Sequence, residues 1–125
     1  MTKKEKLIVT SGYFDPISLK EITHLEKCRQ MGDWLIVGIH SDMLLHLKTG
    51  VLYQSLETRK KILESIRFVD EVFTFNDSND NVCNLLKVVK LCYPRADITY
   101  VSEYDMKNRP ETKIGGINFE TLSKE

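Results

Sequence analysis

Short apolar runs alternate with longer amphipathic segments along this chain, and that alternation constrains the fold more than any other feature. In the second run Leu35, Ile36 and Val37 are consecutive, which is typical of a strand covered on both faces of a parallel sheet. Strands that alternate with helices form right-handed βαβ units. The pattern therefore predicts an α/β fold, a Rossmann-like three-layer sandwich with a parallel sheet of four to five strands. The expected strands lie at residues 7–10, 34–39, 69–75 and 97–102.

Helical periodicity fills the segments between these runs. Ser18 begins the first expected helix, Gly32 is its predicted C-cap, and Pro94 stops the last helix. Residues 43–50 form either a short helix or a loop, and residues 103–125 are a mixed, weakly patterned tail. The expected helices lie at residues 18–31, 57–66 and 82–93.

The segment from Ser11 to Ile22 joins the first expected strand to the first expected helix. Gly12 permits a sharp turn, and Pro16 disfavours helical backbone at the residue before it, so the helix cannot begin before about Ser18. Ser18 and Glu21 match a capping box, in which the serine oxygen accepts the Glu21 amide and the carboxylate accepts the Ser18 amide. A strand, a glycine turn and a helix N-terminus together predict an anion-binding site.

Length and net charge limit the number of domains and the classes of partner that we expect. The 125 residues suffice for one core, so we expect a single domain over residues 1–125. Lys plus Arg equal Asp plus Glu at 18 each, and a chain without net charge has no overall field that draws it to nucleic acid or to an anionic membrane. We therefore expect a local anion site and neither a nucleic-acid nor a membrane partner.

The cysteines and the N-terminus indicate the compartment. Cys28, Cys83 and Cys92 lack metal-ligand spacing, and the Lys-rich N-terminus has no apolar signal segment. No apolar stretch approaches the ~20 residues of a membrane span. We expect a cytoplasmic protein with reduced cysteines and no metal site of its own.

The turn resembles the first half of the signature of the cytidylyltransferase-like nucleotidyltransferases, Gly-(Tyr/Thr)-Phe-Asp-x-x-His-x-Gly-His, and the second half departs from it. Ser18 stands at the first histidine, Lys20 at the glycine and Glu21 at the second histidine. Further blocks resemble this family, including its glycerol-3-phosphate cytidylyltransferase and heptose-phosphate adenylyltransferase branches, in the right order. The matching segments are residues 12–16, 38–42, 47–50, 57–59 and 66–72.

The resemblance implies an enzyme in which a substrate phosphate or hydroxyl attacks the α-phosphorus of a nucleoside triphosphate and pyrophosphate leaves. It implies CTP in preference to ATP, Mg²⁺ bound with the nucleotide, a small phosphorylated alcohol or sugar as acceptor, and a homodimer. If the protein is active, the candidate catalytic residues are Lys48, which the resemblance implies, and Lys20, which departs from the family pattern. The implied nucleotide-binding residues are Gly12, Tyr13, Phe14, Asp15, Ser18, Lys48, Arg59, Arg109 and Asn118.

The replaced histidines leave the activity open. Glu21 puts a hydrogen-bond acceptor and a negative charge where phosphate oxygens would lie, and loss of one donor typically costs about 10²–10³ in rate. Lys20 compensates in part if its ammonium swings over the phosphates. Two interpretations remain: a nucleotidyltransferase whose activity is weakened or lost, and a catalytically silent nucleotide-binding or dimeric scaffold relative.

The tail also has two interpretations. Arg109 and Asn118 match the family's triphosphate-binding segment, in which Asn118 caps a helix. Alternatively, residues 105–116 resemble a stretch of the heptose-phosphate adenylyltransferase branch. In that case we expect the sequence to stop before the triphosphate-binding segment.

The histidines and one leucine group carry further expectations. We expect His24 to face solvent or to pair with Glu21, His46 to be an ordinary surface residue, and His40 to have a packing role or a binding role. The homodimer is expected to cover apolar side chains near the crevice, namely Leu44, Leu45 and Leu47.

Overall fold

Five parallel strands form one sheet in the order β3-β2-β1-β4-β5, in a computed structural model that describes residues 5–122. The central position of β1 and the parallel pairing confirm the predicted α/β fold. Two of the predicted strands, residues 34–39 and 97–102, have the predicted limits. The strands are β1 (Lys6–Gly12), β2 (Trp34–Ile39), β3 (Glu71–Thr74), β4 (Asp97–Ser102) and β5 (Ile117–Thr121).

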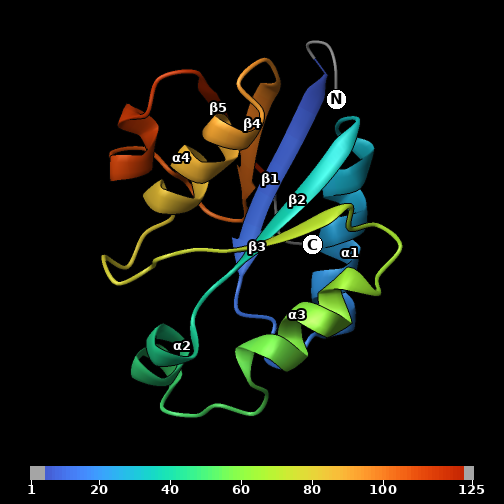
Figure 1. The fold of residues 1–125 in the computed structure, drawn as a ribbon, viewed down its shortest axis with the longest axis vertical. Helices are drawn as coiled ribbons and strands as arrows, with labels where there is room; N and C mark the ends of the chain where they lie inside the picture. Colours follow the sequence, from blue (N-terminus) through green and yellow to red (C-terminus); the bar gives the residue numbers. More distant parts are fainter. Residues whose placement is uncertain (1–4, 123–125) are drawn as a thin grey trace.

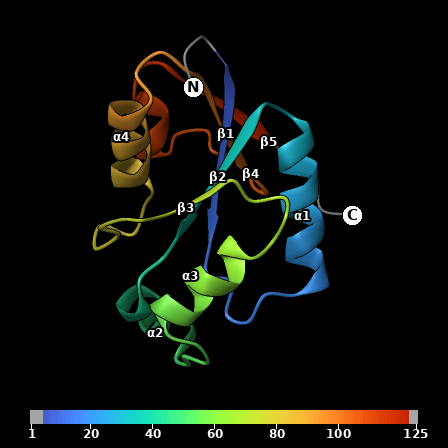
Figure 2. The same cartoon turned by 45° about the vertical axis from the view of Figure 1, so that its right-hand side comes forward.

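Helices cover both faces of the sheet and give the three expected layers (Figures 1 and 2). The helices α1 (Leu19–Gln30) and α3 (Leu56–Glu64) lie on one face. The other face carries α4 (Cys83–Cys92) and a short 3-10 helix, η1 (Pro110–Lys113). The helix α2 (Asp42–Thr49) follows β2 and lies beyond the carboxyl ends of the strands, at the bottom of Figure 1. None of the described helices is both long and apolar enough to span a bilayer.

Side chains of β1 enter the apolar clusters on both faces of the sheet. Leu7 and Val9 pack in the cluster under α4, and Ile8 packs in the cluster under α1 and α3. This alternation follows from the two-residue period of a strand, and it explains why the predicted run is apolar at successive positions. The helices contribute Leu25, Cys28 and Leu63 on one side and Leu85, Leu86 and Val89 on the other.

The first helix ends at Gln30, one residue before its predicted end, so Gly32 is not its C-cap. Met31 is the C-cap, and Gly32 instead allows the chain to pass close to β1, because a Cβ there would lie 2.7 Å from the Lys6 carbonyl oxygen. The buried face of this helix carries Leu25 and Cys28, whereas Leu19 at its first position is 78% exposed.

Two segments that the pattern left open have definite structure. Residues 43–50 contain a helix, since α2 is capped by the Ser41 hydroxyl at its start and by Gly50 with φ 77° at its end. The tail contains β5, which pairs with β4 from Ile117 to Thr121. It is an edge strand in which the half-buried Ile117 and Phe119 alternate with the exposed Asn118 and Glu120. Asn118 therefore lies inside a strand and caps no helix, contrary to the first interpretation of the tail.

Candidate functional site

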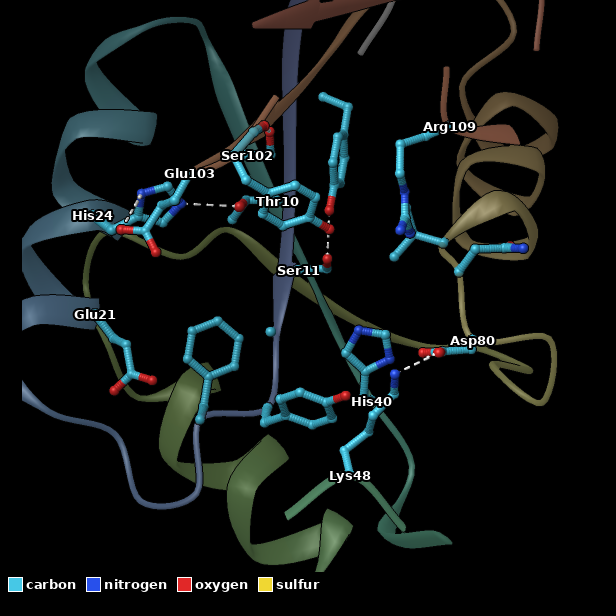
Figure 3. A pocket seen from close by; sticks show the side chains of 17 residues that line it. Thr10, Ser11, Glu21, His24, His40, Lys48, Asp80, Ser102, Glu103 and Arg109 are labelled. Atoms are coloured by element: carbon cyan, nitrogen blue, oxygen red, sulfur yellow. Dashed lines mark hydrogen bonds and ion pairs between the residues drawn. The ribbon is translucent and has the colours of Figure 1, made fainter. Parts of the chain in front are cut away.

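A cavity of about 500 Å³ opens where β1 and β4 end, within the usual size range of small-molecule sites (Figure 3). Five residues of β1 and the following turn line it. The remaining lining residues come from α1, the end of β2, α2, the loop before α4, β4 and the segment between β4 and η1. The lining residues are Thr10, Ser11, Gly12, Tyr13, Phe14, Glu21, His24, His40, Lys48, Asp80, Asn81, Val82, Tyr100, Ser102, Glu103, Tyr104 and Arg109.

The β1–α1 turn forms the floor of the cavity. Phe14 has φ 53° and its ring is buried over Gly12, where a Cβ would lie only 3.0 Å from the ring. Asp15 does not line the cavity. Its carboxylate accepts the backbone amides of Tyr53 at 2.8 Å and Gln54 at 2.7 Å, which ties the turn to the loop before α3.

Arg59 stabilises the same turn from below. Its side chain is fully buried, and its guanidinium donates to the carbonyl oxygens of Gln54, Tyr13 and His40 at 3.1, 3.0 and 2.9 Å. The remaining contact is an ion pair with Asp42 at 2.7 Å. Every nitrogen of the guanidinium is thus used by the protein, and Arg59 does not line the cavity into which a phosphate would enter.

The start of α1 presents a carboxylate to the cavity. The Glu21 carboxylate accepts the Ser18 amide at 2.7 Å, as the capping box predicts, and also the Ser18 hydroxyl at 2.9 Å. Glu21 lines the cavity, whereas Ser18 and Lys20 are exposed beside it and do not. The residues at the first histidine position and at the glycine position of the family signature, Ser18 and Lys20, therefore face solvent, and the residue at the second histidine position lines the cavity.

His24 is inside the cavity wall, so the expectation that it faces solvent or pairs with Glu21 is wrong. Its Nε2 lies 3.0 Å from the Thr10 hydroxyl, which itself donates to the Val101 carbonyl and therefore accepts from the ring. Nδ1 lies 3.8 Å from the Glu103 carboxylate. Burial lowers the pKa of His24, and the nearby Glu103 opposes that change.

His40 extends from the end of β2 into the opposite wall. Its Nδ1 lies 3.0 Å from Asp77, whose carboxylate also accepts the Ser41 amide at 2.8 Å and the Ser41 hydroxyl at 2.7 Å. Tyr13 packs against the imidazole with ring centroids 4.8 Å apart, and Phe75 does so at 5.3 Å. Burial lowers the pKa of His40, and its hydrogen bond to Asp77 opposes that change.

Two cations reach the cavity and each has an acidic partner. Lys48 pairs with Asp80 at 2.5 Å, and this hydrogen bond raises the pKa of the lysine. Arg109 donates to the buried Glu111 from two nitrogens, both at 3.3 Å. Glu111 also accepts the Val82 amide at the start of α4, so it connects the tail to that helix.

Only some of the site residues predicted from the sequence line the cavity. Gly12, Tyr13, Phe14, Lys48 and Arg109 line it, whereas Asp15, Ser18, Lys20 and Arg59 do not. Asn118 is remote from it, because its side chain donates to Asp97 and to the Ile98 carbonyl at the start of β4.

Sequence reasoning missed two acidic residues that hold the site. Asp77 had a signal, since it opens the polar loop after a predicted strand. Glu111 is 0% exposed although it lies in the weakly patterned tail, and no local pattern marks it. Within residues 5–122, no three His, Cys, Asp or Glu side chains are grouped so as to hold a metal ion.

Several known proteins are similar to part of this chain. Glycerol-3-phosphate cytidylyltransferase of Bacillus subtilis (strain 168) is 45% identical over 67 residues, which cover 54% of this chain and 52% of that protein. The bifunctional protein HldE of Pseudomonas savastanoi pv. phaseolicola is 36% identical over 89 residues, which cover 70% of this chain and 18% of that protein. The chain thus spans about half the length of the former and less than a fifth of the latter.

Solved structures and a family model extend this comparison to the whole fold. The lipopolysaccharide core biosynthesis protein from Thermoplasma volcanium GSS1 has a TM-score of 0.76 at 19% identity, with 97% of this chain and 98% of that chain covered. At that identity the likeness shows the fold alone. A family model described as cytidylyltransferase-like matches residues 9–115. Since that match covers most of the sequence, the chain belongs to the cytidylyltransferase-like family.

Proposed function

We propose that the cavity binds a nucleoside triphosphate with Mg²⁺, CTP in preference to ATP, and that nucleotidyl transfer to a small phosphorylated alcohol or sugar is weakened or lost. The family membership and the name of the B. subtilis relative support the nucleotide and the acceptor class. The cavity size and the Gly12 turn at the carboxyl edge of the sheet support the location.

Nucleotidyl transfer needs donors around the phosphates. As the acceptor oxygen attacks the α-phosphorus and pyrophosphate leaves, negative charge is redistributed over phosphate oxygens that a protein must neutralise. Lys48 and Arg109 are the cations that line the cavity, and both are already paired with carboxylates. We assign the nucleotide phosphates to these two side chains and to the backbone of the turn.

Glu21 is the observation that carries the proposed loss of activity. Its carboxylate is held at the start of α1 by two hydrogen bonds from Ser18, so it does not simply turn away from the cavity. Glu103 and Asp80 add two further carboxylates to the lining. A triphosphate in this cavity meets repulsion at the position where an active relative needs a donor, and the missing donor alone costs about 10²–10³ in rate.

Calorimetry and a pyrophosphate assay test the two halves of this proposal. We expect Mg²⁺–CTP to bind more tightly than Mg²⁺–ATP, with little or no pyrophosphate released in the presence of glycerol-3-phosphate or heptose phosphates. Absence of heat with both nucleotides would exclude the proposed binding. Rapid release by the wild-type protein would exclude the weakened site and would show that another donor serves in place of the histidines.

Variants at the start of α1 separate binding from turnover. Glu21→Gln removes the repelling charge and should increase CTP affinity several-fold, whereas Glu26→Gln, on the same helix but outside the cavity lining, should not. The triple change Ser18→His, Lys20→Gly and Glu21→His should strengthen nucleotide binding before it restores turnover. An unchanged affinity in Glu21→Gln would show that this carboxylate does not weaken the site.

The homodimer and the cytoplasmic location remain proposals, and the leucines invoked for the dimer need correction. Leu44 and Leu45 are 7% and 2% exposed because α2 packs them against the body of the protein. Leu47 is 73% exposed, together with Met43 and Tyr53 nearby in the chain. These three side chains are the apolar surface that we assign to a partner subunit.

A further inference from the structure

His40 carries a ring nitrogen that no described residue uses. Nδ1 is hydrogen-bonded to Asp77, whereas Nε2 has no partner among residues 5–122. In Figure 3 the imidazole lies in the wall of the cavity beside Lys48 and Asp80, with its free edge toward the space below Ser11. The ring is 12% exposed and packs against Tyr13 and Phe75, so its direction is set by its neighbours.

Asp77 determines which ring nitrogen carries the proton. Burial alone would raise the pKa of Asp77, but the Ser41 amide, the Ser41 hydroxyl and His40 outweigh it and lower that pKa, so Asp77 is a carboxylate that can only accept. His40 therefore donates from Nδ1. In the neutral ring Nε2 is then a lone pair directed at the cavity, and that lone pair repels a phosphate oxygen.

The charged groups around His40 come from four segments. Asp77 and Asp80 in the β3–α4 loop favour the imidazolium, and Arg59 from α3 disfavours it. Lys48 from α2 and the Tyr13 hydroxyl lie at the same wall of the cavity. Burial within the protein dominates and lowers the pKa of His40, so the ring is neutral at pH 7.5. A phosphate would add negative charge next to Nε2 and shift this balance toward the imidazolium.

We propose that His40, held by Asp77, is a phosphate-binding residue of this cavity that takes up a proton from solvent when the nucleotide binds. The proton goes onto Nε2, which then donates to a phosphate oxygen while Nδ1 continues to donate to Asp77. This supplies an imidazole donor from β2, on a different element from the histidines that are replaced at the start of α1. The inference rests on the proposed function, because it assumes that the cavity takes a phosphate-bearing ligand.

Proton uptake makes the affinity depend on pH in one direction. Between the pKa of His40 in the free protein and its higher pKa in the complex, each unit rise in pH lowers the affinity by up to about tenfold. The heat of binding then also depends on the buffer, because the buffer supplies the proton.

Calorimetry in buffers of different ionisation enthalpy tests the proposal with Mg²⁺–CTP and with pyrophosphate as probes. At pH 7.5 the wild-type protein should take up a substantial fraction of one proton per ligand. His40→Gln keeps an amide donor near the Nε2 position but does not titrate, so its uptake and its pH dependence should be lost. His46→Gln, at an exposed position of α2, should behave as wild type. His24→Gln should keep the uptake, because Nε2 of His24 is used by Thr10 and its other ring nitrogen, Nδ1, lies 3.8 Å from the Glu103 carboxylate and not at the proposed phosphate position.

The outcomes separate this inference from the proposed function. Binding without proton uptake, or uptake that survives in His40→Gln, would overturn the role of His40 while leaving nucleotide binding intact. Proton-linked binding of pyrophosphate without binding of CTP would support His40 and exclude the nucleotide. No binding of either probe would overturn both. If His40→Gln does not fold, the NMR titration of the wild-type imidazole decides instead, since saturating pyrophosphate should raise the pKa of His40.

Discussion

Arg59 offers the sharpest test of how this site is built. The family resemblance predicts that its guanidinium contacts a phosphate, whereas in the structure the buried guanidinium holds the β1–α1 turn through backbone carbonyl oxygens. In Arg59→Met an apolar side chain of similar length replaces the guanidinium. Three buried carbonyl oxygens, those of Gln54, Tyr13 and His40, lose their donor. Each unsatisfied buried group costs about 1–3 kcal/mol. The ion pair adds little, because Asp42 is 42% exposed and water screens it.

We expect Arg59→Met to lower the free energy of unfolding by about 3–5 kcal/mol, at the low end of the sum for three carbonyl oxygens that lose their donor. That is a large part of the 5–15 kcal/mol that stabilises a typical domain. Urea unfolding followed by circular dichroism measures it, with Lys61→Met on the exposed face of α3 as the matched control, expected within about 0.5 kcal/mol of wild type. Arg59→Lys should be intermediate, because one ammonium cannot reach all three oxygens.

The opposite pattern would refute this reasoning. If Arg59→Met unfolds at nearly the wild-type urea concentration but loses CTP affinity tenfold or more, the guanidinium turns into the cavity and binds phosphate. If Arg59 instead supports the turn, Arg59→Met should lower the free energy of unfolding, and the CTP affinity of the protein that remains folded should change less.

Three other predictions follow from single contacts. Burial alone would raise the pKa of Glu111, but the Val82 amide and Arg109 outweigh burial and lower that pKa. The Glu111 carboxylate therefore contributes to the free energy of unfolding at neutral pH, and this contribution is lost as the pH falls below the ordinary pKa of a glutamate side chain. In pH-dependent urea melts, Glu111→Gln should cost about 1–3 kcal/mol at pH 7 and flatten the acid limb, and an unchanged limb would exclude this role. Gly38→Ala should cost about 1–3 kcal/mol in thermal melts, since its Cβ would lie 2.4 Å from Leu85, and a neutral effect would mean that the leucine moves freely. In sedimentation at micromolar concentration, wild type should exceed the 14.5 kDa of one chain and Leu47→Asp should not; a wild-type monomer would exclude the dimer.

The sequence by itself determined the elements whose signals are local. Residues 34–39 form a strand with the predicted limits because a strand buried on both faces must be apolar at successive positions, whatever lies around it. Residues 97–102 also have the predicted limits, and their signal is the β-branched and aromatic run from Ile98 to Val101. The carboxylate half of the capping box forms between Ser18 and Glu21, which are three residues apart, and needs no tertiary partner. The glycine turn and its place at the carboxyl edge of the sheet follow from the same local rules.

The tertiary structure alone decided which polar side chains face the cavity. His24 lies one turn before Cys28 on the buried side of α1, and its orientation depends on Thr10 of a neighbouring strand. Asn118 joins a strand because β4 offers it a free edge, a partner that lies about twenty residues away. The Arg59 side chain is buried because four groups from three segments converge on it, namely the β1–α1 turn, the junction of β2 with α2 and the loop before α3, and no spacing in the sequence records that convergence. Long-range hydrogen bonds satisfy buried polar groups one at a time, whereas the local pattern reports only where the chain is apolar.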